Sequence, residues 1–464
     1  MLLFAILLCI PSIQYLLMNR TVDGFDAYYT YRLMKSNNEM IGLLSGCIVI
    51  GLILLFSLCY LVVIKKEKQI FQNKKQVFIW IACISFIFMM ILPFLSSDIY
   101  YYIGDSWLSS QYHENPYYTS VADLQEKGIQ DEILNNTGYW KNTTSVYGPL
   151  WNGIARGLVS LSFGKVTIAL FVFKLASYAV HLAIVALVYK MTKSTKCMLL
   201  YGLNPLVLIE FLSNVHNDIY LVFFTGLSFY FLLKQKNIYL TMISLAFSIS
   251  IKYSTVLLVP FVLLYYFRKE KILKKIGYCF ISGLAIVGMV VLLYLPYYRD
   301  VSIFTNMLVQ GQKYSQSILT ILLIKADKKI FDSINFFLMP VFVIVYVDML
   351  INICFDKKLT WHKCMKIYNK EMLIFIFIVL SNFQKWYLLW ILPSFIWQNK
   401  TMRKFTLILT LTAILPSISY FRVEGDPYDI GMTYSIKVLI FAGILLMITY
   451  AKNICHKIKL ERKI

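Results

Sequence analysis

The sequence predicts an all-α polytopic membrane protein. Hydrophobic residues make up 59% of the 464 residues, mean hydropathy is +0.66, and 15% of the residues are charged, whereas soluble domains carry about 25% charged residues. The formal net charge of +21 does not indicate nucleic acid binding, because the lysines cluster in short connections between apolar segments. Such a distribution is the positive-inside pattern, so these connections are expected to face the cytoplasm and its anionic lipids. They are 65–75, 268–275, 356–366, 399–404 and 452–464.

About ten apolar segments are candidate full transmembrane helices. The first, 2–18, lacks the basic start and the small-residue cleavage site of a signal peptide, so we expect it to remain as a helix. With the N-terminus inside, the loop 97–164 lies outside and the connection 190–196 returns inside. The ten segments are 2–18, 41–64, 77–96, 165–189, 197–212, 218–233, 276–296, 333–353, 404–420 and 432–451.

Two further apolar segments, 238–267 and 371–397, carry Lys252 and Lys385 near their middles and lie between lysine-bearing connections. As single helices they would place the connections 268–275 and 356–370, with five lysines or arginines each, on the outer face, against the positive-inside pattern. As hairpins, each half would be about 20 Å long, too short for the ~30 Å hydrocarbon core. Broken segments of this kind occur where they line a water-filled cavity. The sequence therefore predicts two broken or re-entrant hairpins with a lysine at each apex, and up to 14 membrane segments in all.

No fixed-period repeat, low-complexity tract or flexible linker divides the chain, so we expect one integral membrane domain over 1–464, with two helices in 1–64. The nine cysteines lie in apolar segments or on the lysine-rich side. None lies in 97–164, the longest non-membrane segment, or in 297–330. The sequence therefore contains no exported disulfide framework.

Two acids lie directly after the third apolar segment, in the sequence SSDIYYYIGDSWLSSQYHENPYY. Asp98 and Asp105 are seven residues apart, so on a helix they share one face at roughly 10 Å, and Tyr101 and Tyr102 share that face with Asp98. A carboxylate beside a partly desolvated cleft suits a general base, which we assign to Asp98. Asp105 suits a sugar hydroxyl or a divalent ion. The alternative is a helix that emerges into water, with solvated acids.

The sequence SNVHND places three further polar residues at the outer end of an apolar segment. His216, Asn217 and Asp218 are candidate substrate-binding residues, since one histidine and one aspartate are too few for a metal site. The alternative is an outer turn in which Asn217 or Asp218 caps the next helix. Glu210, four residues before Asn214 in an apolar run, indicates a polar interior face instead.

Lysines within membrane segments usually face a cavity or a partner. Lys252 and Lys385, at the two predicted apices, would hold a phosphate group in the outer cavity. Snorkelling to the interface explains Lys174, but Lys252 lies about fifteen positions from either charged flank. Arg422, in the last outer loop, is a third candidate phosphate contact, or a residue of a solvated loop.

Aromatic residues accompany these charges. Trp386, Tyr387 and Trp390 would either form an interfacial belt or line a lipid groove. Tyr147, beside the Gly-Pro turn of SVYGPLW, is a candidate substrate contact, although an aromatic belt would also account for it. Flat rings beside acids suit a sugar, because they offer an apolar plate for its C–H faces.

These motifs together resemble the glycosyltransferase C superfamily, specifically its bacterial polyprenyl-phosphate-hexose-dependent, mannosyltransferase-like members. The resemblance spans 77–400 and implies a glycosyltransferase C-like fold, an outward-facing active site with an acid in the first long loop, here Asp98, and a lipid-phosphate-linked sugar donor. Two features depart from it: two helices precede the usual first helix, and Lys385 stands where relatives often have proline or another residue. The matching motifs are DIYYYIGD with NPY (98–105 and 115–117), YGPLW (147–151), NPLVLIE with NVHND (204–218), IKYSTVLLVPF (251–261) and KWYLLWILP (385–393).

The expected function is transfer of a mannose-like hexose from a polyprenyl-phosphate donor to a glycan or lipid-linked acceptor, with inversion, at the outer face of the cytoplasmic membrane. Asp98 would deprotonate the acceptor, and the cationic residues would stabilise the departing phosphate. No cofactor is required, with a divalent metal as an option. One alternative is a lipid-linked sugar flippase or transporter, which usually shows paired halves that are not found in this sequence. Another is a lipid-linked glycan polymerase or ligase.

Overall fold

The computed structural model describes residues 1–18, 39–305, 328–380, 382–395, 400–417 and 437–443. Over these ranges the fold is all-helical, with no β-strand longer than a single bridge residue. The α-helices are α1 (Leu2–Met18), α3 (Glu39–Lys65), α4 (Glu67–Ile70), α5 (Lys74–Met90), α6 (Asp98–Gln111), α7 (Val121–Glu126), α8 (Glu132–Asn135), α9 (Pro149–Val159), α10 (Val166–Thr192), α11 (Thr195–Gly202), α12 (Pro205–Val207), α13 (Asp218–Tyr230), α14 (Ile238–Ile249), α15 (Val259–Tyr266), α16 (Ile272–Tyr294), α19 (Lys328–Phe355), α20 (Trp361–Ile374), α21 (Leu392–Phe395) and α22 (Lys400–Thr412).

Four helices in the described part of the chain are long and apolar enough to cross a membrane. They are Gly46–Lys65, Val166–Thr192, Ile272–Tyr297 and Phe337–Phe355. A bent pair, α11 with Pro205–Ser213, turns by 47° and makes a fifth if it is one span. The prediction of a helical membrane protein is confirmed, but about ten full spans and up to 14 membrane segments are not supported.

The physical reason for the difference lies in where helices end. Hydropathy counts apolar residues, whereas caps and breaks set helix length. α1 and α5 have 17 residues each, which is about 26 Å and short of the ~30 Å core. Asn73 caps α5 by accepting from the Gln76 N–H at 3.0 Å, and Pro205 opens a new helix after α11. The predicted span 432–451 lies largely outside the described residues.

The two lysine-centred segments are interrupted near their lysines. α14 ends at Ile249, Lys252 is extended (φ −154°, ψ 132°), and a 3₁₀ turn, Tyr253–Leu258, leads into α15. In the second segment the chain is extended at Leu380, and a 3₁₀ turn begins at Lys385. The predicted interruptions are therefore confirmed. Re-entry of each segment from the outer side stays a prediction.

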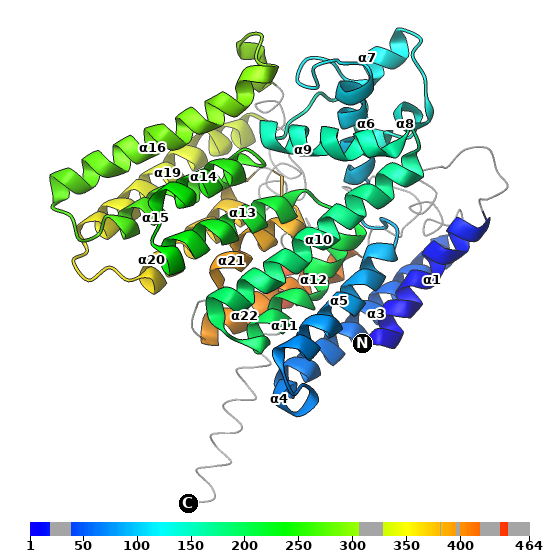
Figure 1. Ribbon diagram of the computed structural model, residues 1–464, viewed down its shortest axis with the longest axis horizontal. Coiled ribbons are helices and arrows are strands. Elements are labelled where there is room, and N and C mark those ends of the chain that lie inside the picture. Colours follow the sequence, from blue (N-terminus) through cyan, green and yellow to red (C-terminus); the bar gives the residue numbers. More distant parts are fainter. Residues whose placement is uncertain (19–38, 306–327, 381, 396–399, 418–436, 444–464) are drawn as a thin grey trace, which may run out of the picture.

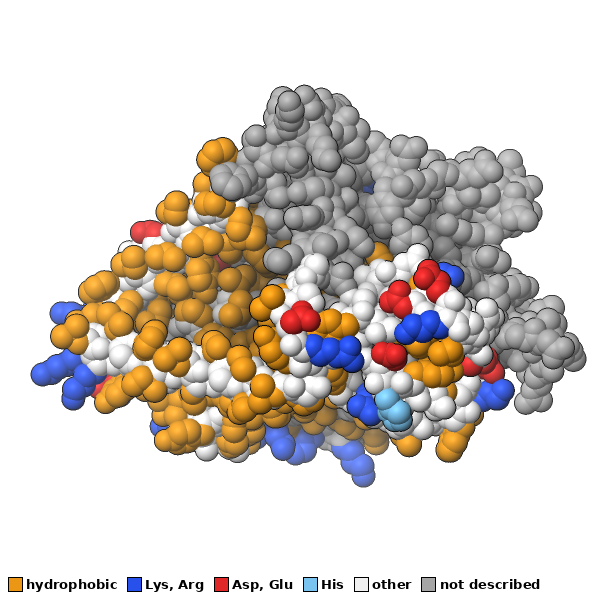
Figure 2. All heavy atoms as spheres, turned by 90° about the horizontal axis from the view of Figure 1, so that it is seen from above, with side chains coloured by type: hydrophobic (Ala, Val, Ile, Leu, Met, Phe, Trp, Pro, Cys, Tyr) orange, Lys and Arg blue, Asp and Glu red, His pale blue; other side chains and the backbone are white. Residues whose placement is uncertain are grey.

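The helices form one bundle with a cap at one end (Figure 1). α1 packs on α3 and α5, α10 packs on α5 and α13, and α14 packs between α13 and α16. The short helices α6 to α9 gather at one end, whereas α4 and the α10–α11 connection lie at the opposite end (Figure 1). Seen from the capped end, charged side chains of both signs gather over the cap, and hydrophobic side chains cover much of the side on which α16 lies (Figures 1 and 2).

A close backbone contact ties the cap to the interrupted segment. The Gly148 N–H donates to Ile251 O at 3.1 Å, and the Leu150 N–H donates to Ser250 O at 3.0 Å. A Cβ at Gly148 would lie 2.1 Å from Ser250 O, so no larger residue fits there without a backbone shift. The Gly-Pro turn therefore holds Tyr147 beside the break at Lys252.

Candidate active site

The most polar part of the interior begins at Asp98, the first residue of α6. Its side chain is 20% exposed, and its Oδ2 lies 3.6 Å from Nδ1 of His216, which is fully buried. Nε2 of His216 lies 3.2 Å from Oε2 of buried Glu210. Oε1 of Glu210 lies 3.4 Å from Nζ of Lys385, whose side chain is 2% exposed. We call this series, Asp98–His216–Glu210–Lys385, the acid–imidazole chain.

Carboxylates and nitrogen-bearing side chains alternate along the acid–imidazole chain. Both ring nitrogens of His216 face a carboxylate, so an imidazolium could donate in both directions. Each carboxylate of the series thus lies next to the imidazole, and Glu210 also lies next to the Lys385 ammonium, which limits the cost of burying the acids. Asp98 is thereby held from its inner side by His216, while its outer side remains open to accept a proton.

Local backbone structure places His216 in this series. Glu210 lies on a π-helical turn, Leu208–Ser213, of the kind often found at functional sites. Val215, just before the histidine, has φ of +59°, a left-handed conformation that is strained for a β-branched residue by about 1–3 kcal/mol. The imidazole stacks on Trp386, with ring centroids 3.7 Å apart and an interplanar angle of 21°.

Two polar side chains fix the π-helical turn against the end of α5. The amide oxygen of Asn214 accepts from the N–H groups of Phe94 and Leu95, each at 3.2 Å, and its amide nitrogen donates to Glu210 at 3.1 Å. The second side chain is the ammonium of Lys174, which donates to three backbone carbonyls at 2.8–2.9 Å. These carbonyls belong to Ile91, Leu212 and Ser213. Lys174 is fully buried, so the snorkelling interpretation is wrong: the three carbonyls replace water around the ammonium.

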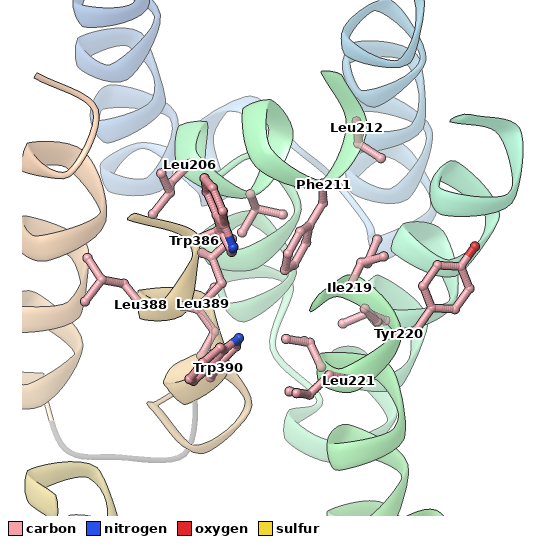
Figure 3. Packing of buried hydrophobic residues seen from close by; sticks show 14 of the residues in the cluster. Leu206, Phe211, Leu212, Ile219, Tyr220, Leu221, Trp386, Leu388, Leu389 and Trp390 are labelled. Atoms are coloured by element: carbon pink, nitrogen blue, oxygen red, sulfur yellow. The ribbon is translucent and has the colours of Figure 1, made fainter. Parts of the chain in front are cut away.

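A second ion pair lies beside the first series. Nζ of Lys252 contacts Asp218 at 3.0 and 3.3 Å, and the lysine side chain is 20% exposed whereas the aspartate is buried. The ammonium also lies over the rings of Tyr387 and Trp390, at 4.8 and 5.2 Å from their centroids. The Trp390 indole donates to Asp218 as well. Figure 3 shows Trp386 and Trp390 projecting from one turn toward the segments that hold Phe211 and Ile219.

Tyrosines of the cap form the aromatic wall next to these charges. The rings of Tyr102 and Tyr147 meet edge to face at 5.2 Å, and their hydroxyls are 3.4 Å apart. The Tyr101 ring lies 6.3 Å from that of Tyr147, tilted by 44°, and its hydroxyl donates to Thr143 O at 3.3 Å. Burial raises the pKa of Tyr147 first, and the nearby carboxylate of Asp98 raises it further. This wall therefore lies against the catalytic candidate.

Asp105 and Asn217 are placed differently from the other predicted residues. Asp105 lies further along α6 and is 5% exposed; burial raises its pKa from 3.8 to about 8, and a hydrogen bond with Ser145 opposes the rise. Asn217 is fully buried and precedes α13 without a side-chain capping bond. Neither of its amide atoms has a hydrogen-bond partner in the described residues. The capping alternative therefore does not account for Asn217.

The structure thus brings most of the predicted residues into one region; Arg422 lies outside the described residues. Sequence reasoning did not place Glu210 in the site, although an acid within an apolar run is a signal for it. Over the described ranges, no group of three or more histidine, cysteine, aspartate or glutamate side chains could hold a metal ion. The site roles of the individual residues stay predictions.

An accessible carboxylate backed by buried charges and walled by aromatic rings, in a helical membrane protein, is an arrangement that suits the active site of an integral membrane enzyme. Residues 3–268 match the family described as alpha-(1->6)-mannopyranosyltransferase, N-terminal domain. The match covers more than half of the chain, which therefore belongs to this family and is a mannosyltransferase-like glycosyltransferase. The matched range includes Asp98, Glu210, His216 and Lys252. No curated protein and no solved structure matches the chain.

Proposed function

We propose that the protein transfers a mannose-like hexose from a polyprenyl-phosphate donor to a hydroxyl of a glycan or lipid-linked acceptor at the outer face of the cytoplasmic membrane. The observation that carries this proposal is the exposure gradient along the acid–imidazole chain. Asp98 is 20% exposed, whereas His216 and Glu210 are fully buried. A base must be reached by the proton that it abstracts, and Asp98 meets that condition.

In the proposed reaction Asp98 accepts the proton of the acceptor hydroxyl while the oxygen attacks the anomeric carbon. The bond between that carbon and the phosphate oxygen breaks, and polyprenyl phosphate leaves with the electron pair. A phosphate leaving group needs charge stabilisation more than protonation. Lys252 is the best-supported contact for it, because its side chain is 20% exposed. Lys385 and Arg422 are further candidates, although Lys385 would have to leave Glu210 to reach the donor.

The remaining groups would position the two sugars. Tyr101, Tyr102 and Tyr147 offer rings and hydroxyls beside Asp98, Asn217 offers an unoccupied amide, and Asp105 offers a further hydrogen-bonding group. The lipid-linked phosphate of the donor would lie beside Trp386, Tyr387 and Trp390. A single displacement inverts the anomeric centre, as in inverting glycosidases. A β-linked donor would therefore give the α-linkage that the family description names.

The test is transfer from a synthetic polyprenyl-phosphate mannose to labelled glycan acceptors by purified wild type and Asp98→Asn. We expect the variant to lose about 10²- to 10⁴-fold in rate, the usual contribution of a general base, with an unchanged melting temperature. Glu126→Gln, at an exposed acid of the same cap, is the matched control and should retain full activity.

Wild-type turnover by Asp98→Asn would contradict the assignment of the base. Movement of intact donor across the bilayer, without consumption, would instead indicate a flippase. If the donor that is consumed is an oligosaccharide lipid rather than a monosaccharide lipid, the protein is a polymerase or ligase.

A further inference from the structure

The loops α15–α16 and α19–α20 together line an open cavity of about 640 Å³. Six of its eleven lining residues are cationic and one, Glu270, is acidic. We call this cavity the basic pocket. Both loops lie at the ends of α16 and α19 that point away from the cap (Figure 1), so the basic pocket is remote from Asp98. Its cationic residues are Arg268, Lys269, Lys271, Lys275, Lys357 and Lys358.

One of these cations is buried and donates to a neutral group. Lys275 is 6% exposed, and its ammonium donates to the neutral carbonyl of Cys354 at 2.7 Å. Within the described ranges no carboxylate forms an ion pair with it. A buried charge is costly unless an opposite charge accompanies it. The environment of Lys275 therefore favours an anion in the cavity that it lines.

The neighbouring acid, Asp356, interacts electrostatically with Lys275, but other groups hold both of its oxygens. Asp356 lies in the same loop as Lys357 and Lys358, but Lys363 holds its Oδ2 at 2.6 Å, and the backbone N–H of Lys358 donates to its Oδ1 at 2.8 Å. Lys357 and Lys358 are exposed and form no ion pair with any residue that the structure describes. With six cations against Glu270 in its lining, the basic pocket therefore keeps an excess of positive charge.

The backbone adds to this preference. α16 begins after Lys271 without a side-chain cap, so the N–H groups of its first turn remain available next to Ile272, which lines the cavity. The N-terminus of a helix carries about half a positive charge and favours anions. This contribution reinforces the side chains, which carry most of the charge.

We propose that the basic pocket is a binding site for a phosphate group at the lysine-rich face of the protein. A phosphate with several acceptor oxygens matches the number of donors better than a single carboxylate does. Two sources share this chemistry: the headgroup of an anionic phospholipid and a soluble phosphate. Basic pockets on the cytoplasmic side of membrane proteins take phosphorylated headgroups, and the sequence predicts that this face is cytoplasmic.

The test uses the full chain in phosphatidylcholine nanodiscs at constant ionic strength. Short-chain phosphatidylglycerol and inorganic phosphate are titrated separately, and the thermal shift gives a Kd for each. The pocket variant is Lys271→Gln/Lys357→Gln/Lys358→Gln. The control variant is Lys66→Gln/Lys68→Gln/Lys75→Gln, which removes three exposed lysines near α4, outside the lining residues of the basic pocket.

We expect a saturable shift with one or both probes, a Kd at least about tenfold higher in the pocket variant, and an unchanged Kd in the control variant. A response to phosphatidylglycerol alone identifies a lipid headgroup, and a response to inorganic phosphate alone identifies a soluble ligand. Equal losses in the two variants would reduce the effect to general surface charge and overturn the proposal. So would the absence of a saturable shift with either probe.

Discussion

Asp98 and His216 act in different ways in the proposed mechanism, although they touch. Asp98 is reached by solvent and would meet the acceptor, whereas His216 is buried behind it and contacts Glu210 on its other side. His216 is therefore a positioning residue. Its influence on the rate should be exerted through the orientation of the Asp98 carboxylate.

This division predicts a coupled effect of two substitutions. His216→Gln should lower kcat by about 10²-fold, since it removes the imidazole whose two nitrogens face the carboxylates of Asp98 and Glu210. In the Asp98→Asn background, the same substitution should have almost no further effect, because residues that act as a unit are not additive. Rates of mannosyl transfer in the four proteins of the cycle measure this. Independent, multiplicative losses would contradict a role through Asp98.

Asp105 gives a pH-dependent contribution to stability. Burial raises its pKa from 3.8 to about 8, so between these values the folded state holds a proton that the unfolded state lacks. The free energy of unfolding should therefore fall as pH rises from about 4 to about 8, by at most about 1.4 kcal/mol per pH unit. Melting temperatures of wild type and Asp105→Asn in detergent, from pH 5 to pH 9, test this. The variant should lack the fall in stability with pH that Asp105 causes. Parallel curves of melting temperature against pH for the two proteins would contradict this role of Asp105.

At the scale of the elements, the sequence shows where polar residues interrupt apolar runs. It does not show which hydrogen bonds those residues form. The breaks near Lys252 and Lys385 follow from a lysine in the middle of an apolar segment. The hydrogen bonds of Lys174 do not follow from its position, because they depend on carbonyls freed at the end of α5 and at a π-helical turn. Hydropathy cannot show which backbone groups a helix end leaves unpaired.

Lys174 should consequently be important for stability. Lys174→Met removes three hydrogen bonds to buried carbonyls and leaves them without donors, which should cost about 3–5 kcal/mol. The melting temperature in detergent, followed by circular dichroism, should fall accordingly. The matched control is Lys165→Met, at a lysine whose side chain is 62% exposed and which pairs with Glu132 at 2.9 Å; its effect should stay within about 1 kcal/mol. Equal changes in the two variants would show that the buried contacts contribute little.

At the scale of the whole molecule, composition predicts the class and the charge distribution predicts the two faces, but neither predicts the number of spans. Four membrane-length helices are described where about ten full spans were expected, because much of the apolar sequence is used in short, bent or interrupted helices. Apolar residues in such helices pack against each other, as around Trp386 and Phe211 (Figure 3). Most of the residues assigned to the candidate site lie together nonetheless, since each marks a polar position in an apolar stretch.

The predicted orientation can be tested without knowledge of the substrates. The cap formed by α6 to α9 should face outside, and α4 should face the cytoplasm, because lysine-rich connections stay inside. Glu126→Cys, in the cap, and Lys68→Cys, in α4, both replace exposed residues. A membrane-impermeant thiol reagent should label the first variant in intact cells and the second only after permeabilisation, each measured above the labelling of the unsubstituted protein. The reverse pattern would place Asp98 on the cytoplasmic side, where a polyprenyl-linked donor delivered to the outer leaflet would not reach it.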